Sequence, residues 1–352
     1  MKAFYIKYNL QFKRPSGTSR GVLTYKDTWF LVIEENGKRG IGECGLLRGL
    51  SIDDRPDYEL KLQWVCANIN SGFDNLYHLL LDFPSIQFGL EAAFLSLAAE
   101  NPFILFPSKF TEGTRNIPIN GLVWMGDPEY MKSQIDEKLA DGFDCIKIKI
   151  GALDFAKELN ILSHIRKNYS EDQIEIRVDA NGGFGVTDAL HKISQLSEFK
   201  LHSIEQPIAT NQHDSMSELC KSSPIPIALD EELIGAFTSE QKDALIEKIK
   251  PQYLILKPSL IGGFQGSESW IAIAEKYNVG WWITSALESN IGLNAIAQWT
   301  FGLNSKMPQG LGTGALYTNN IKSPLEVKNG KLLYNADNDW NLKPLFKNEF
   351  FM

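Results

Sequence analysis

The amino-acid sequence predicts an α/β fold, a (β/α)8-type barrel in its modified β/α form, together with an α+β capping domain. Three observations predict it: evenly spaced apolar runs, amphipathic segments between them, and mixed α and β patterns in the N-terminal third. The apolar runs start at residues 117, 145, 175, 202, 225, 253, 280 and 310. Successive starts are roughly 23 to 30 residues apart, the length of one strand, one helix and two loops. Because polar residues follow nearly every run, a closed barrel is favoured over an open doubly wound sheet.

The two ends of the chain are predicted to build the capping domain. We assign residues 1–112 and 318–352 to this domain and residues 113–317 to the catalytic barrel. Residues 323–335 return to strand and turn composition after the last apolar run. We expect this tail to pack on the first domain.

The individual elements follow from the hydrophobic period. Residues 21–45 alternate β-branched and aromatic residues around an Asn-Gly pair, which predicts a hairpin. Residues 57–72 and 86–101 repeat apolar positions at intervals of three and four, which predicts two helices. The second is apolar on nearly every side and should be buried. The same helical period predicts an outer ring of barrel helices, at residues 127–142, 154–169 and 267–278 among others.

Composition and charge exclude several classes of partner. The chain has 352 residues, of which 43% are hydrophobic and 22% charged, as is typical of a packed enzyme-sized protein. Its formal charge of −8 disfavours a general binder of nucleic acid or anionic membranes. It has no run near about 18 apolar residues and no signal-peptide core, so we expect neither a membrane span nor export. Cys44, Cys66, Cys145 and Cys220 are far apart, which indicates reduced thiols and a cytoplasmic location.

Charged side chains follow the apolar runs of five consecutive predicted strands. In a closed barrel the carboxyl ends of the strands form the working face, so these residues are candidates for chemistry. Lys147 and Lys149 are two apart on one strand, so both side chains point to the same face. The following strands end in Asp179 and Asn181, in Glu205, in Asp230 and Glu231, and in Lys257. Any one of them could be a solvated charge or an ion pair, but five consecutive strand ends favour a single site.

Three of these residues suggest a metal site. The carboxylates of Asp179, Glu205 and Asp230 would repel one another if they met without a cation. A set of oxygen donors suits Mg²⁺, with Mn²⁺ as a substitute, whereas zinc prefers His and Cys. The metal charge and the mutual repulsion of the lysines should lower the lysine pKa values. A partly neutral amine is a usable base near pH 7.

The strand-end motifs also resemble those of a known family. The segments KIKIG, RVDANGGF, IEQP, ALDEEL and LKPSLIGG, in this order, are similar to the barrel of the enolase superfamily, muconate-lactonizing branch. The resemblance covers nearly the whole chain, because that family also has an α+β capping domain. It implies that Lys149 is the base, Lys147 the neighbour that lowers its pKa, and Lys257 the lysine on the other face. It implies metal ligation by Asp179, Glu205 and Asp230, next to which we expect Asn181 and Glu231.

Within that branch the sequence is similar to members that eliminate water. The similarity lies in LKPSLIGG followed by ITSALESNIGLNAIAQ, and in the early segment GECGLLRGLSIDDRPDYE. It implies a lyase of menaquinone biosynthesis that removes the proton α to a carboxylate and expels a β-hydroxyl. The small-molecule substrate would be a cyclohexadiene carboxylate with a succinyl arm. The last predicted strand, GLGTGAL, has no acid, which counts against dipeptide epimerases that hold a substrate amine there.

A carboxylate on the succinyl arm would need contacts of its own. We expect them from Ser285 and from backbone N–H groups around Gly312 and Gly314, where missing side chains let the main chain approach a ligand. Residues 14–21, RPSGTSRG, have the composition of a loop. We interpret them as a mobile lid in which Arg20 contacts the anionic substrate.

Three other functions fit parts of the pattern. A racemase or epimerase of N-acylated amino acids or dipeptides would exchange the α-proton without loss of water. A lysine Schiff-base aldolase would be trapped by borohydride and would not need three clustered acids. A non-catalytic metal-binding or ligand-binding barrel would turn over no substrate. The sequence leaves the oligomeric state open.

Overall fold

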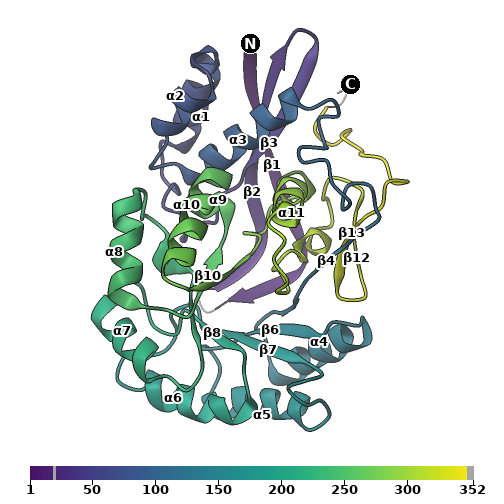
Figure 1. Cartoon of the computed structure of the whole chain (residues 1–352). Coiled ribbons are helices and arrows are strands. Elements are labelled where there is room, and N and C mark those ends of the chain that lie inside the picture. The colour runs from purple at the N-terminus through teal and green to yellow at the C-terminus, as the bar shows by residue number, and fades with distance from the viewer. Residues whose placement is uncertain (19–20, 347–352) are drawn as a thin grey trace.

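The chain begins with a long antiparallel hairpin that continues into a third strand (Figure 1). The computed structural model describes residues 1–18 and 21–346. The three strands pair in the order β1–β2–β3 and cover Lys2–Thr18, Gly21–Glu35 and Lys38–Cys44. Asn36 and Gly37 both have positive φ at the β2–β3 turn, as an Asn-Gly hairpin requires. The hairpin predicted for residues 21–45 is confirmed.

Three helices accompany this sheet: α1 (Tyr58–Ala67), α2 (Phe73–His78) and α3 (Pro84–Ala98). α1 and α3 confirm the two helices that the hydrophobic period predicted, with ends shifted by a few residues. α3 is the buried one, and it contacts both β3 and the barrel helices α9 (Pro258–Ile261) and α10 (Gly263–Lys276). Glycine permits the close approach of α3 to β3, because a Cβ at Gly42 would lie 1.9 Å from the carbonyl oxygen of Gly89.

Seven parallel strands form the curved barrel sheet, and they follow one another in chain order from β5 to β11. The strands are β5 (Gly121–Val123), β6 (Cys145–Lys149), β7 (Glu175–Asp179), β8 (Ser203–Glu205), β9 (Ile227–Leu229), β10 (Tyr253–Leu256) and β11 (Gly280–Ile283). The other barrel helices are α4 (Pro128–Ala140), α5 (Phe155–Arg166), α6 (Ala189–Leu196), α7 (His213–Ser222), α8 (Ser239–Ile249) and α11 (Asn290–Gly302). Helices α4 to α8 lie outside the sheet (Figure 1). Among the described residues, no helix is long and apolar enough to cross a bilayer.

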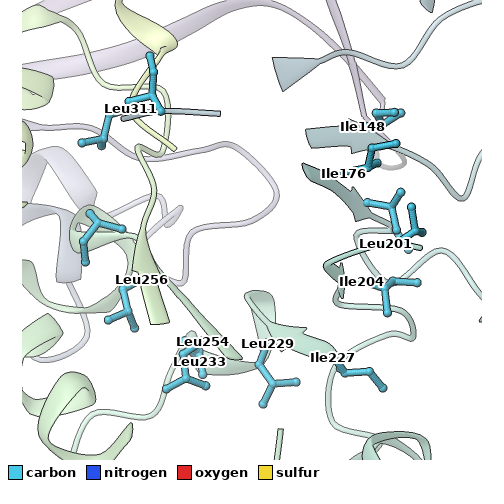
Figure 2. Packing of buried hydrophobic residues seen from close by; sticks show 14 of the residues in the cluster. Ile148, Ile176, Leu201, Ile204, Ile227, Leu229, Leu233, Leu254, Leu256 and Leu311 are labelled. Atoms are coloured by element: carbon cyan, nitrogen blue, oxygen red, sulfur yellow. The ribbon is translucent and has the colours of Figure 1, made fainter. Parts of the chain in front are cut away.

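Alternating side chains give each barrel strand two different faces. Figure 2 shows isoleucine and leucine side chains from successive strands arranged in an arc, among them Ile148, Ile176 and Ile204. These apolar residues belong to the large core cluster that includes the barrel helices. Lys149 directly follows Ile148, and Asp179 lies three residues after Ile176, so both point to the opposite face. The alternation thus directs the charged residues into the barrel.

The eighth predicted strand is absent, which corrects the expectation of eight equal units. Residues 309–316 make only single parallel bridges, Ile119 to Gln309 and Thr284 to Gly310, and then a short 3₁₀ helix, Thr313–Leu316. The segment GLGTGAL holds three glycines in five residues, and glycine disfavours the regular extended conformation. The ring is therefore completed between β11 and β5 by an irregular segment, which fits the modified form of the barrel.

The tail forms a small sheet of its own. β12 (Leu325–Lys328) and β13 (Lys331–Tyr334) make a hairpin. β13 pairs with β4 (Ile117–Pro118), which comes just before the first barrel strand in the chain. Leu345 and Phe346 then pack in a cluster with β2 residues. The last described residues therefore contact the three-stranded sheet, whereas the hairpin joins the barrel side. The domain boundaries at 112/113 and 317/318 stay a prediction.

Candidate active site

Both lysines of β6 lie inside the barrel. Lys147 and Lys149 are buried, and the parallel register of β6 and β7 places Lys149 beside Asp179. The Nζ of Lys149 donates to Asp179 Oδ2 and to Asn181 Oδ1, each at 2.7 Å. The Nζ of Lys147 lies 2.8 Å from the same Asp179 oxygen and donates to Glu205 Oε2 at 2.5 Å. The two amines therefore share one carboxylate oxygen.

The three predicted acids come from consecutive strands and lie close together. Asp179 ends β7 and Glu205 ends β8, and these two residues are paired in the parallel register. Asp230 directly follows β9. All three are buried. Lys257 follows β10, donates to Asp230 Oδ2, and has its Nζ 4.0 Å from Glu205 Oε1. The structure thus brings the predicted carboxylates and lysines into one cluster.

Two further predicted residues support this cluster. The backbone N–H of Asn181 donates to Asp179 Oδ1 at 3.0 Å, and its Nδ2 donates to Glu231 Oε1 at 3.0 Å. The φ of Asn181 is 45°, in the left-handed region that asparagine tolerates better than most residues. Its amide therefore joins Lys149 to Glu231, and the position of the Lys149 amine depends on both.

The lysine pKa values shift in different directions. Burial alone would lower the pKa of Lys147, but nearby carboxylates, Asp179 foremost, outweigh it and raise that pKa. Burial at Lys257 is likewise outweighed by Asp230, and the pKa of Lys257 is raised. Burial lowers the pKa of Lys149, and the charges of Lys147 and Lys257 lower it further against the opposing charge of Asp179. Among the protein's own groups, burial and the other lysines therefore lower the pKa of Lys149 alone, and the lowering of all three lysine pKa values by a bound metal ion stays a prediction.

The cluster opens into a cavity of about 640 Å³, a volume typical of sites for small molecules. Lys147, Lys149 and Lys257 line its barrel side. The β1–β2 hairpin, with Leu47 and Leu50 from the loop after β3, lines the other side. A second cavity of about 660 Å³ lies near Tyr253 and Gly280, at the amino ends of the strands, and none of the predicted site residues that the structure describes line it. The first cavity is therefore the candidate substrate site.

The predicted contacts of the succinyl arm are only partly placed at this cavity. Ser285 lines it, but its hydroxyl donates to Glu288 Oε2 at 2.5 Å and accepts from Thr313 Oγ1 at 2.7 Å. The hydroxyl proton is thus committed to a buried carboxylate. Gly312 lines the cavity, whereas Gly314 does not and instead lies against Asn290. Contact of these residues with substrate stays a prediction.

The segment interpreted as a lid belongs to the β1–β2 hairpin in its described part. Ser16 and Gly17 pair with Leu23 and Val22 after an irregular register, and Gly17 also bridges to Met125 of the barrel. The expectation of a loop is therefore wrong for residues 14–18, which belong to β1: residues 16–18 pair with β2, and residues 14 and 15 lie in the irregular register before them. Arg20, the predicted contact of the substrate anion, lies outside the described residues.

Sequence reasoning missed a buried polar network between the hairpin and the barrel. The fully buried Lys26 donates from Nζ to the carbonyl oxygens of Ala286 and Leu287, at 3.0 and 2.9 Å. Glu43 accepts from Ser289 N at 2.9 Å and from Ser289 Oγ at 2.5 Å, at the beginning of α11. Lys26 occupies the buried phase of β2, where the period predicts an apolar residue. A lysine at a position where the strand period predicts an apolar side chain was the signal in the sequence for this buried network.

The donor set fits a magnesium ion in chemistry, although the cluster would have to rearrange to hold one. Among the described residues, no three Asp, Glu, His or Cys side chains are arranged to hold a metal ion as they stand. Lys147 and Lys257 bind the carboxylates instead. Glu205 Oε1, however, is buried and accepts no hydrogen bond from any described residue. Burial and the nearby charge of Asp179 raise the pKa of Glu205 well above its ordinary value, so a cation beside it would be stabilising.

Comparison with known proteins places this chain in a family. Residues 130–337, more than half of the chain, match the family model described as enolase C-terminal domain-like. This range contains all the predicted lysines and metal ligands. The chain is therefore a member of the enolase superfamily, and its fold is the one that the motifs predicted.

Closer relatives define the group within that superfamily. The chain is 46% identical to the o-succinylbenzoate synthase of Desulfotalea psychrophila, over 94% of this chain and 98% of the relative. The crystal structure of MenC from D. psychrophila superposes with a TM-score of 0.84 at 43% identity, covering 95% and 99% of the two chains. The chain belongs to the o-succinylbenzoate synthase family and is an enzyme of the lyase class. A dipeptide epimerase from Cytophaga hutchinsonii, solved with Mg and D-Ala-L-Val, shares the fold, with a TM-score of 0.79 at 20% identity over 97% and 96% of the chains.

Proposed function

We propose that the enzyme is a Mg²⁺-dependent dehydratase of menaquinone biosynthesis. It would convert 2-succinyl-6-hydroxy-2,4-cyclohexadiene-1-carboxylate to o-succinylbenzoate and water. The observation that carries the proposal is the Lys149 amine, which has a lowered pKa, lines the cavity and lies among three buried carboxylates. The 46% identity with the D. psychrophila o-succinylbenzoate synthase supports this choice of substrate.

Lys149 would act as the base. The proton α to a carboxylate is weakly acidic because its removal leaves a dianionic enediolate, so most of the barrier is charge stabilisation. The neutral Lys149 amine takes the proton from the ring carbon, and the C–H electron pair becomes part of the new π system. As the C–O bond at the β-carbon breaks, Lys149 returns the proton to the departing hydroxyl, which leaves as water. Aromatisation makes this second step downhill.

The other lysines would keep their charge. The pKa of Lys147 and that of Lys257 are raised by adjacent carboxylates, so both remain ammonium groups at neutral pH. Lys147 lowers the pKa of Lys149 by repulsion. Lys257 faces the substrate from the opposite side of the cluster and stabilises the developing negative charge. Asn181 holds the Lys149 amine in place through its 2.7 Å contact.

Asp179, Glu205 and Asp230 would hold the metal ion. When bound, Mg²⁺ supplies positive charge that stabilises the substrate carboxylate as it becomes an enediolate. Its binding would release Lys147 and Lys257 from part of their contacts with these acids. The sequence supplies no comparable set of His and Cys ligands.

The decisive experiment follows the ultraviolet absorbance of the cyclohexadiene substrate with and without Mg²⁺. We expect turnover with Mg²⁺, loss of turnover after exhaustive chelation, and recovery when Mg²⁺ or Mn²⁺ is added back. The Asp230→Asn enzyme should need a higher Mg²⁺ concentration for half-maximal activity, because one negatively charged ligand is lost. Full activity after chelation would rule out the metal requirement.

A second measurement separates dehydration from epimerisation. Lys149 and Lys257 both contact the cluster, and two lysines on opposite sides also suit two-base exchange of an α-proton. Deuterium uptake at the α-carbon of N-acylated amino acids or dipeptides, without loss of water, would favour an epimerase. No turnover on either class of substrate would favour a binding protein.

A further inference from the structure

The irregular segment that completes the barrel wall in place of the eighth strand lies beside the lysine cluster, and hydrogen bonds join Gln309 and Gly310 to the wall on both sides. Thr284 follows β11 and bridges to Gly310, while the backbone N–H of Asn120, before β5, donates to Gln309 O at 3.0 Å. Thr284, Gly310 and Asn120 all line the 640 Å³ cavity that also contains Lys147, Lys149 and Lys257. A Cβ at Gly310 would lie 2.5 Å from Thr284 Oγ1. Only glycine at position 310 therefore lets the wall segment approach the Thr284 side chain this closely.

Two side-chain oxygens beside this wall segment have no hydrogen-bond partner within the described part of the chain. Asn120 Oδ1 and Thr284 Oγ1 are buried and make no hydrogen bond, and only 5% of Asn120 is exposed. Leaving a buried polar atom unsatisfied costs free energy, and such groups in native proteins call for an explanation. Rotation of the Asn120 amide by half a turn exchanges its oxygen and nitrogen, so the same position can present a donor. Asn120 and Thr284, which both line the cavity, can thus offer N–H and O–H donors to a ligand there.

Ser285, the residue that the sequence predicts to contact the succinyl arm, already has a hydrogen-bond acceptor within the protein. The Ser285 hydroxyl gives its proton to Glu288, and the buried position of both residues holds that bond in place. A ligand oxygen would have to displace a carboxylate to gain this donor. Asn120 and Thr284 have no such competitor, so a ligand gains their hydrogen bonds without breaking others.

We propose that Asn120 and Thr284, on either side of Gly310, form the subsite that binds the terminal carboxylate of the succinyl arm. This proposal rests on the proposed function. A carboxylate has lone pairs for both donors, and the ring carboxylate is left to the lysine and acid cluster. Asn120 and Thr284 are then specificity-determining residues that contact the arm and not the reacting carbon.

The test uses two substitutions that remove a donor and no internal hydrogen bond, Asn120→Leu and Thr284→Val. Because neither side-chain oxygen has a partner in the free protein, we expect thermal unfolding temperatures equal to or above that of the unchanged enzyme. Two ligands are compared on each protein by calorimetry: o-succinylbenzoate, and 2-butanoylbenzoate, which keeps the ketone and lacks the terminal carboxylate. The affinity ratio of the two ligands does not depend on the fraction of active protein.

We expect o-succinylbenzoate to bind about tenfold more weakly to each variant and 2-butanoylbenzoate to bind unchanged. Asn120→Asp should weaken o-succinylbenzoate further, because it places a negative charge beside the carboxylate. An unchanged ratio, or an equal loss for both ligands, would overturn the subsite. If the unchanged enzyme neither binds o-succinylbenzoate nor dehydrates the cyclohexadiene substrate, the proposed function itself fails and the subsite with it.

Discussion

Lys149 differs from the other two lysines of the cluster in the balance of charge around its amine. It contacts one carboxylate, Asp179, and the neutral amide of Asn181, whereas Lys147 contacts two carboxylates. Burial therefore dominates at Lys149 and lowers its pKa, while charge dominates at Lys147 and raises it. Two lysines on one strand thus acquire opposite proton affinities.

The first prediction concerns this base. Lys149→Ala should lower kcat for dehydration by about 10²-fold to 10⁴-fold, the range for loss of a positioned acid–base group. The fold should be retained, because Asp179 keeps its 2.8 Å contact with Lys147. Absorbance kinetics and circular dichroism would measure the two effects. Lys132→Ala, at a surface ion pair with Glu129, is the control, and turnover comparable to this control would remove Lys149 from the role of base.

At the scale of elements, the segment between β11 and α11 connects the cavity to the capping sheet. Ala286 and Leu287 line the cavity, and Lys26 of β2 binds the carbonyl oxygens of both. Leu287 has a φ of 65°, a strained value for a residue other than glycine, and Tyr317 also donates to its carbonyl at 2.7 Å. The shape of this cavity wall therefore depends on a lysine about 260 residues away in sequence.

Substitution of Lys26 tests this dependence. Lys26→Met keeps most of the side-chain volume but removes the donors to two buried carbonyls, which should cost about 2 kcal/mol of stability. We expect KM for the cyclohexadiene substrate to rise several-fold, because Leu287 is free to relax, and kcat to fall less. Thermal unfolding and steady-state kinetics check both effects. Lys7→Met, at an exposed ion pair of β1 with Glu59, should change neither quantity, and identical behaviour of the two variants would contradict the prediction.

At the scale of the whole molecule, α3 joins the capping region to the barrel. Glu91 of α3 accepts hydrogen bonds from the backbone N–H groups of Phe264, at 2.6 Å, and Gln265, at 3.3 Å, near the beginning of α10. α10 comes soon after Lys257 in the chain, so this contact supports the active-site side of the barrel. Burial raises the pKa of Glu91 to about 8, although these two N–H groups oppose the shift.

The pH dependence of unfolding follows from this raised pKa. Since folded Glu91 binds its proton more tightly than unfolded Glu91, its contribution to stability is present at pH 4 and is lost as the pH rises toward 8. The free energy of unfolding should fall by a few kcal/mol more in the unchanged enzyme than in Glu91→Gln over this range. Urea unfolding at pH 5 and pH 9 measures the difference. Parallel pH profiles for the two proteins would show that Glu91 does not carry this effect.

Much of the fold was predictable because it depends on local period and on the order of elements. The β2–β3 hairpin, the buried helix α3 and seven of the eight barrel units follow from apolar spacing. The absence of the eighth strand was not predictable from apolar spacing. The spacing of GLGTGAL fits a strand, whereas its glycines weaken strand pairing. Residues 14–18 have the composition of a loop, but the pairing of residues 16–18 with β2 makes the segment part of a strand.

The sequence by itself determined which charges reach the active site. Strand ends and the alternation of side chains placed Lys147, Lys149, Asp179, Glu205 and Lys257 inside one barrel, because both rules act within a few residues. Only the tertiary structure decided what each charge does. Three features depend on distances between residues remote in sequence: the opposite pKa shifts of the two β6 lysines, the contact of Lys26 with the β11–α11 segment, and the side-chain oxygens of Asn120 and Thr284 that have no partner among the described residues. Electrostatic and hydrogen-bond energies change steeply with such distances, and no local pattern encodes them.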